Sequence, residues 1–157
     1  MIRTLAFSAA IAALATPALA LSCLRPDVVQ TYKRAAEAEE SYSVVIGTIR
    51  FDESKLPKSV GNDSPPNTRI AARFQGKALT KSGFDMPFAR NITLEVLCFG
   101  PWCGGAGSDE TYLAFLKREK TGYVMEADPC GGMLFQSPTE HMLDQVERCF
   151  TGGRCGN

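Results

Sequence analysis

The chain has 157 residues, with 17 basic and 17 acidic side chains that give a formal net charge of zero at pH 7. This balance excludes a strongly basic nucleic-acid-binding protein and an acidic solvating tail, so no nucleic acid partner is expected. The length suits a single domain with one hydrophobic core.

The first residues have the pattern of a secretory signal peptide. Arg3 precedes an apolar, alanine-rich run at residues 5–14, and Ala18-Leu19-Ala20 fits the small-x-small rule of signal peptidase. The run is shorter than the ~20 residues that a membrane-spanning helix needs. Cleavage after Ala20 is therefore predicted, leaving no transmembrane segment.

The mature part, residues 21–157, is then one domain of a periplasmic or secreted protein, and its alanine-rich signal is of bacterial type. The alternative is a lipoprotein anchored through Cys23. Ala20 stands where a lipoprotein signal has a larger aliphatic residue, and lipidation would leave an odd number of cysteines. Whether Cys23 becomes the N-terminus stays open at this point.

All six cysteines lie in the mature part. An even number of cysteines in an exported chain is typical of disulfide bonds, because the compartment is oxidising. Spacing alone does not choose among the possible pairings. The cysteines are Cys23, Cys98, Cys103, Cys130, Cys149 and Cys155.

One helix and five strands are expected in the first part of the domain. Pro26 and Asp27 begin the helix, which runs to about Glu40, because proline is tolerated in a first turn and Asp27 suits the positive end of the dipole. The strands are predicted from alternating apolar residues or from β-branched runs. They cover residues 42–51, 68–79, 92–98, 111–117 and 122–127, with a polar loop at 52–67 and a glycine-rich loop at 98–110.

A second helix is predicted near the C-terminus. Ser137, Pro138, Thr139 and Glu140 form a capping box with proline at the first helical position. An apolar stripe follows, and Gly152-Gly153 supplies the stop. The stripe is Met142, Leu143, Val146, Cys149 and Phe150. Five strands between two helices predict a mainly β fold, a small barrel with flanking helices.

Little in the chain indicates an enzyme. The triplet Trp-Cys-Gly at 102–104 begins like a thioredoxin active site, but Ala106 stands where the second cysteine is needed. His141 is the single histidine, so neither a Ser-His-Asp set nor a zinc site of several ligands can be assembled. We expect a non-enzymatic protein without metal or cofactor. The alternative is a thiol–disulfide redox protein that uses Cys98 and Cys103.

The segment Phe99-Gly100-Pro101-Trp102 is the best candidate for a binding loop. Aromatic side chains on a disulfide-bridged loop are common anchors at interfaces, so Phe99, Pro101 and Trp102 are predicted to contact a partner. The alternative is that Phe99 and Trp102 cap one end of the barrel.

Several short motifs follow one another in a distinctive order. Together they resemble the netrin-like module, the fold of the tissue inhibitors of metalloproteinases, over most of residues 23–130. The resemblance implies a five-stranded OB-type barrel. The motifs are Val44-Val45-Ile46-Gly47-Thr48-Ile49, Phe74-Gln75-Gly76, Cys103-Gly104, Tyr112-Leu113-Ala114-Phe115, Gly122-Tyr123-Val124-Met125 and Cys130.

The resemblance also implies a set of disulfide bonds. Family members usually begin with Cys-x-Cys, whose first cysteine pairs with that of the Cys-Gly motif and whose second pairs with the one closing the hairpin. This chain has only the second, Cys23, so the resemblance pairs it with Cys130. Cys103 must then find another partner, for which Cys98 is nearest, and Cys149 with Cys155 would tie off the last helix.

In that family the cysteine-linked N-terminus and neighbouring loops form the binding ridge. By analogy, residues 22–25, with Leu24 and Arg25, would join residues 101–104 in contacting a protein or envelope component that the sequence does not identify. The animal inhibitors chelate the protease zinc through an N-terminal cysteine. Two residues precede Cys23 after the predicted cleavage, so inhibition of a peptidase would need another mechanism.

Overall fold

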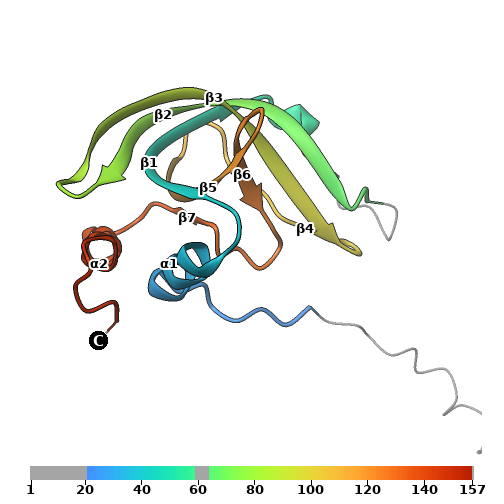
Figure 1. Cartoon of the computed structure of the whole chain (residues 1–157). Coiled ribbons are helices and arrows are strands. Elements are labelled where there is room, and N and C mark those ends of the chain that lie inside the picture. The colour runs from blue at the N-terminus through green and yellow to red at the C-terminus, as the bar shows by residue number, and fades with distance from the viewer. Residues whose placement is uncertain (1–20, 59–63, 157) are drawn as a thin grey trace, which may run out of the picture.

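The computed structural model describes residues 21–58 and 64–156. The predicted signal peptide, residues 1–20, lies outside the described residues, as do residues 59–63 of the polar loop. Seven strands, two α-helices and one short 3-10 helix occur in the described part (Figure 1). They are α1 (Val28–Glu37), β1 (Tyr42–Phe51), η1 (Glu53–Lys55), β2 (Asn67–Thr80), β3 (Gly83–Phe99), β4 (Trp102–Cys103), β5 (Thr111–Glu119), β6 (Gly122–Ala127), β7 (Leu134–Gln136) and α2 (Glu140–Phe150).

Five strands form a closed ring. Hydrogen-bonded neighbours follow the order β1-β2-β3-β6-β5, and β1 pairs with β5 to close it. The β3–β6 pair is parallel, and the other pairs of the ring are antiparallel. Strand β4 pairs with the end of β3, and β7 pairs with the first half of β5. The prediction of a mainly β protein with two helices is confirmed.

Two apolar clusters hold these elements together. The first fills the ring, and its largest members include Phe74, Leu94 and Tyr112. The second lies between the ring and the two helices, where Phe115 of β5 and Val146 of α2 are buried. Both helices lie on one side of the sheet, below β5 and β7 in Figure 1. Strand β5 is therefore buried on both faces, which explains its continuous apolar run.

Helix α1 begins where the sequence predicts and ends earlier. The Asp27 side chain accepts a hydrogen bond from the backbone N–H of Gln30 at 2.8 Å, which caps the first turn. The helix ends at Glu37, before the predicted Glu40, and Ala38 is already extended. Acidic side chains after residue 36 disfavour further turns, because the C-terminal end of a helix is the negative end of its dipole.

The predicted capping box of α2 is wrong in its register. The N-cap is Thr139, not Ser137, because the Thr139 hydroxyl accepts from the backbone N–H of Met142 at 3.3 Å. Ser137 directly follows β7 and is still bonded to β5, because its N–H donates to the carbonyl of Thr111 at 2.9 Å. At the other end Gly152 has a φ of 79°, which supports the predicted stop.

The hairpin of β2 and β3 is longer than predicted. Strand β3 begins at Gly83 rather than near Ile92, so the pair forms a long arm that reaches α2 (Figure 1). The backbone N–H of Phe84 donates to a carboxylate oxygen of Glu147 at 3.3 Å. Pro87 is tolerated because β3 pairs only with β2 at this point, so its missing N–H faces no second strand.

Candidate functional site

The end of β3 and the short strand β4 form a tight hairpin. Cys98 faces Cys103 in the register, and Phe99 faces Trp102. A disulfide joins the two cysteines, whose Cα atoms are 4.0 Å apart. Gly100, with a φ of 60°, makes the turn that a residue with a side chain would adopt less readily. The covalent bond therefore holds the two aromatic residues side by side on one face.

Both aromatic side chains of this hairpin are exposed. Phe99 is 47 % exposed and Trp102 is 38 % exposed, whereas the neighbouring Cys98 is buried. Pro101, in the turn between them, is half-buried. This exposure favours a binding surface over the alternative interpretation, in which Phe99 and Trp102 cap one end of the ring. We call Phe99, Pro101 and Trp102 the aromatic tip.

The N-terminal segment is attached to the loop that follows β6. A disulfide joins Cys23 to Cys130, and Pro26 packs against Gly131. Leu24 is 92 % exposed, and Arg25 is also exposed. Among the described residues, no hydrogen bond or ion pair joins these two side chains to the aromatic tip.

The aromatic tip is anchored beside the same loop. Gly104, directly after β4, lies so close to the end of β6 that a Cβ atom there would come within 2.0 Å of the Ala127 carbonyl oxygen. The backbone N–H of Gly104 also donates to the carbonyl of Leu97 at 2.8 Å. The structure thus attaches the N-terminal segment and the tip to one loop, without bringing Leu24 into contact with Trp102.

All six cysteines form disulfides. The three pairs are those that the resemblance implies, and the pair Cys149–Cys155 closes the end of α2. A redox role for Cys98 and Cys103 would need an accessible sulfur, because a thiolate must be reached by its substrate. Cys98 is buried and Cys103 half-buried, so a structural role of this bond is favoured.

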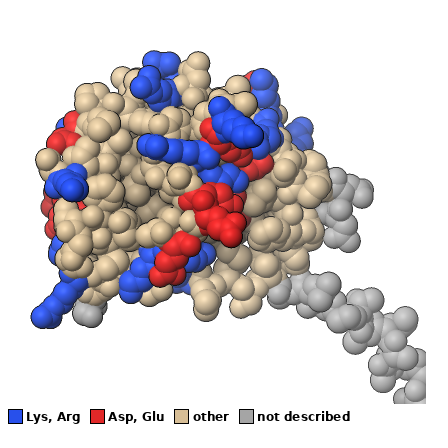
Figure 2. Space-filling model, in the orientation of Figure 1, with Lys and Arg blue, Asp and Glu red and all other residues tan. Residues whose placement is uncertain are grey.

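Charged side chains are mixed on the face seen in Figure 2, where acidic groups gather near β6 and α1 with basic groups around them. Arg69 forms ion pairs with the buried Glu95 at 3.2 Å and with Glu119 at 2.9 Å. The hydrogen bond from Arg69 holds the pKa of Glu119 below its ordinary value. Burial raises the pKa of Glu126. These charges neutralise one another rather than form a uniform patch.

The helix that carries His141 presents this side chain to solvent. Within the described residues, no group of three or more histidine, cysteine, aspartate or glutamate side chains could hold a metal ion. The described helices include none that is long and apolar enough to cross a membrane.

Sequence reasoning missed a cleft of about 260 Å³ between α1, β1, the β2–β3 arm and the end of α2. Its rim carries Met86 and Phe150, two of the exposed large apolar side chains, and Arg118 lines one end. Phe84, Met86 and Phe88 alternate with polar residues or proline, and this signal could have predicted the strand that brings Met86 there.

Fold and site together define a mainly β, disulfide-bridged protein with an exposed aromatic tip. No protein-family model, no curated protein and no solved structure matches the chain. The resemblance to netrin-like modules therefore stays a prediction.

Proposed function

We propose that this chain is an exported, non-enzymatic binding module that engages a protein partner through the aromatic tip. One observation carries the proposal: Phe99 and Trp102 are exposed as a pair on a hairpin that a disulfide holds rigid. A fold rarely leaves two adjacent large aromatic side chains in water without a use, since each buries roughly 150–250 Å² of surface on contact.

The shape of the tip favours a partner with an apolar pocket. Aromatic side chains, tryptophan among them, lose little conformational entropy on binding, and tryptophan and tyrosine are enriched at the hot spots of interfaces. The Cys98–Cys103 bond fixes the backbone before binding, so less freedom is lost when the complex forms. Leu24 and Arg25, on the segment held by Cys130, would add a second contact at the periphery.

A netrin-like, OB-type fold for the chain is part of the same proposal. It is supported by the strand order β1-β2-β3-β6-β5, with closure through β1 and a single parallel pair, β3–β6. It is also supported by the disulfide from Cys23, before α1, to Cys130, which follows the β5–β6 hairpin in the chain. Such a fold does not by itself define an activity.

Export can be tested by the intact mass of the protein recovered from the periplasm or the medium, before and after reduction and alkylation. We expect a chain that begins at Leu21 and lacks roughly two mass units for each of three disulfides. A mass that includes a lipid on Cys23 would mean that the protein is anchored to a membrane. Free thiols at Cys98 and Cys103 would instead favour the redox alternative.

The binding role is tested with the mature protein and its Phe99→Ala/Trp102→Ala variant, each immobilised and exposed to the exported proteins of the source cell. A protein that the wild type retains is then purified, and its dissociation constant is measured for the wild type and for each variant. We expect Trp102→Ala to weaken binding by about tenfold or more. The melting temperature should change by less than about 2 °C, because Trp102 lies outside the core.

Met86→Ala is the matched control, since Met86 is an exposed large apolar residue on another part of the molecule. Binding of the same partner should be unchanged in this variant. A partner that binds the tip variants as tightly as the wild type would refute the proposal. Titration of the purified protein against secreted peptidases tests the narrower function of peptidase inhibition.

A further inference from the structure

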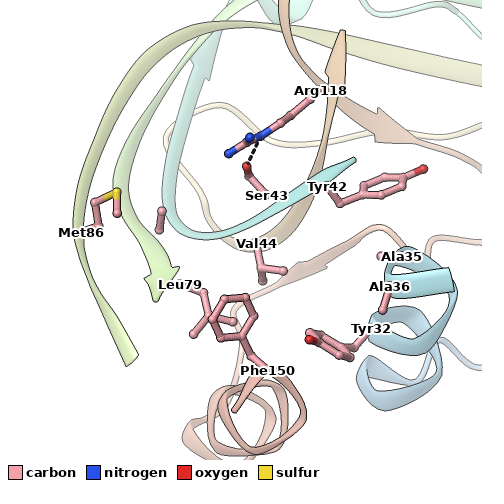
Figure 3. A pocket seen from close by; sticks show the side chains of 11 residues that line it. Tyr32, Ala35, Ala36, Tyr42, Ser43, Val44, Leu79, Met86, Arg118 and Phe150 are labelled. Carbon is pink, nitrogen blue, oxygen red and sulfur yellow. Dashed lines mark hydrogen bonds between the residues drawn. The ribbon is translucent and has the colours of Figure 1, made fainter. Parts of the chain in front are cut away.

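The cleft next to α1 and α2 is lined by residues of six elements, which are α1, β1, β2, β3, β5 and α2. Tyr32 and Ala36 come from α1, Val44 from β1, Leu79 from β2, and Phe150 from the end of α2 (Figure 3). Its walls are mostly aliphatic and aromatic. Small-molecule sites in proteins have this composition, with few polar groups that fix the orientation of the ligand.

One end of the cleft is cationic. Arg118 of β5 is the one charged residue among the described residues that line it. Its Nε donates to the Ser43 hydroxyl oxygen at 2.9 Å, and the guanidinium lies 5.9 Å from the centre of the Tyr123 ring. In the described residues no hydrogen bond engages its two terminal nitrogens. The side chain is thus held in place by Nε and keeps free donors.

The opposite end is apolar and partly open. Figure 3 shows the Phe150 ring reaching into the cleft from α2, across from Arg118, with Met86 at one side and Tyr32 at the other. Met86 is 55 % exposed and Phe150 is 39 % exposed. A tyrosine phenol is protonated at neutral pH, and burial raises the pKa of Tyr32 further, so this side chain can donate a hydrogen bond.

We propose that this cleft binds a small apolar monocarboxylate, with its carboxylate on Arg118 and its apolar body between Tyr32, Met86 and Phe150. A guanidinium with free donors matches a carboxylate in charge and in geometry. Arg118 is charged and no acidic side chain lines the cleft in the described residues, so the lining favours an anion over a cation.

The volume limits the size of the ligand. About 260 Å³ corresponds to roughly nine water molecules at ~30 Å³ each. The ligand therefore has on the order of ten non-hydrogen atoms, as hexanoate and benzoate have. For ligands of this size we expect dissociation constants on the order of 1 mM or lower.

The test is a titration of the mature protein with hexanoate and benzoate, followed by backbone amide chemical shifts. Hexanol and hexylamine are the neutral and cationic controls. We expect shifts at residues of the cleft, such as Ser43 and Leu79, and binding of the carboxylates about tenfold tighter than that of hexanol. Arg118→Gln should reduce hexanoate to the affinity of hexanol, whereas Arg73→Gln, an exposed arginine away from the cleft, should change nothing.

A second variant tests the contribution of the cleft's space separately from that of the Arg118 charge. Ala36 lines the cleft on the exposed side of α1, so Ala36→Phe should fill it and abolish binding without affecting the core. Four outcomes would each overturn the proposal. They are equal binding of hexylamine and hexanoate, chemical shift changes outside the cleft, unchanged binding in Ala36→Phe, and the absence of any carboxylate binding. The Phe99→Ala/Trp102→Ala variant should bind hexanoate normally, because the cleft does not depend on the aromatic tip.

Discussion

Gly47 of β1 and Gly76 of β2 face each other in the strand register at a distance that leaves no room for a side chain. A Cβ atom on Gly76 would lie 2.0 Å from the carbonyl oxygen of Ile46 and 2.6 Å from the Cα atom of Gly47. On its other side Gly47 pairs with Tyr112 of β5. The two glycines thus allow β1 to turn within the ring while it remains bonded to both neighbours.

Gly76→Ala should therefore destabilise the fold by about 2 kcal/mol or more, because the contacts around its new methyl group are backbone atoms that cannot move aside. Denaturation by urea measures this loss. Gly105→Ala is the matched control, since no atom lies within 4 Å of a Cβ there, and it should stay within about 0.5 kcal/mol of the wild type. Equal losses for both would show that the close approach is not what requires glycine.

The disulfides should differ in their contribution to stability according to the length of chain that they close. Cys23 and Cys130 are 107 residues apart, and Cys98 and Cys103 are 5 apart. Loop-closure entropy then gives about 5 kcal/mol for the first bond and about 2 kcal/mol for the second.

Replacing each pair by two alanines and measuring unfolding in urea checks this order. A larger loss for the Cys98/Cys103 variant would mean that the hairpin organises more of the sheet than its own tip. Loss of partner binding in a Cys98/Cys103 variant that remains folded would match the role proposed for the aromatic tip.

The N-cap of α2 can be tested by substituting Ser137 and Thr139, which lie two residues apart before the helix. Thr139→Ala removes the side chain that accepts from Met142 and should cost about 1 kcal/mol. Ser137→Ala should cost less than about 0.5 kcal/mol, since in the structure Ser137 is bonded to the sheet through its backbone. If Ser137→Ala were the more costly change, the capping box predicted from sequence would be the correct one.

Much of this fold could be predicted from residue patterns. Strand β1 covers the predicted residues, and α1 begins within two residues of the predicted start, because both depend on local preferences. Strand β7, of three residues, is too short to show any period and exists only because it pairs with β5. The choice between Ser137 and Thr139 as N-cap could not be made locally either, because both side chains can cap and tertiary pairing selects one.

The candidate sites were harder to predict than the strands. The exposure of Phe99 and Trp102 depends on which face of β3 turns outward at its end, and this is set by the register with β4. The cleft combines side chains from α1, β1, β2, β3, β5 and α2, so no segment carries its signature. The disulfide pairs were implied by the family resemblance, whereas spacing alone left them open.

Glu126 and Glu119 should change the pH dependence of the free energy of unfolding in opposite directions. Burial raises the pKa of Glu126 in the fold, helped by Asp128, Glu95 and Glu40 and opposed by Lys117. Stability from this group is then complete below the pKa of the unfolded chain and is lost as the pH rises through the higher pKa of the folded state. Glu126→Gln should therefore melt above the wild type at pH 7, and the difference should vanish below about pH 4.

Glu119 provides the comparison of opposite sign. The hydrogen bond from Arg69 lowers its pKa in the fold, so its contribution is present above the unfolded pKa and is lost as the pH falls through the folded one. Glu119→Gln should therefore melt below the wild type at pH 7 and approach it in acid. Thermal unfolding of the three proteins from pH 3 to pH 8 checks both signs. Shifts of the same sign for both variants would mean that loss of a negative charge, rather than the burial of one carboxylate and the pairing of the other, determines the effect.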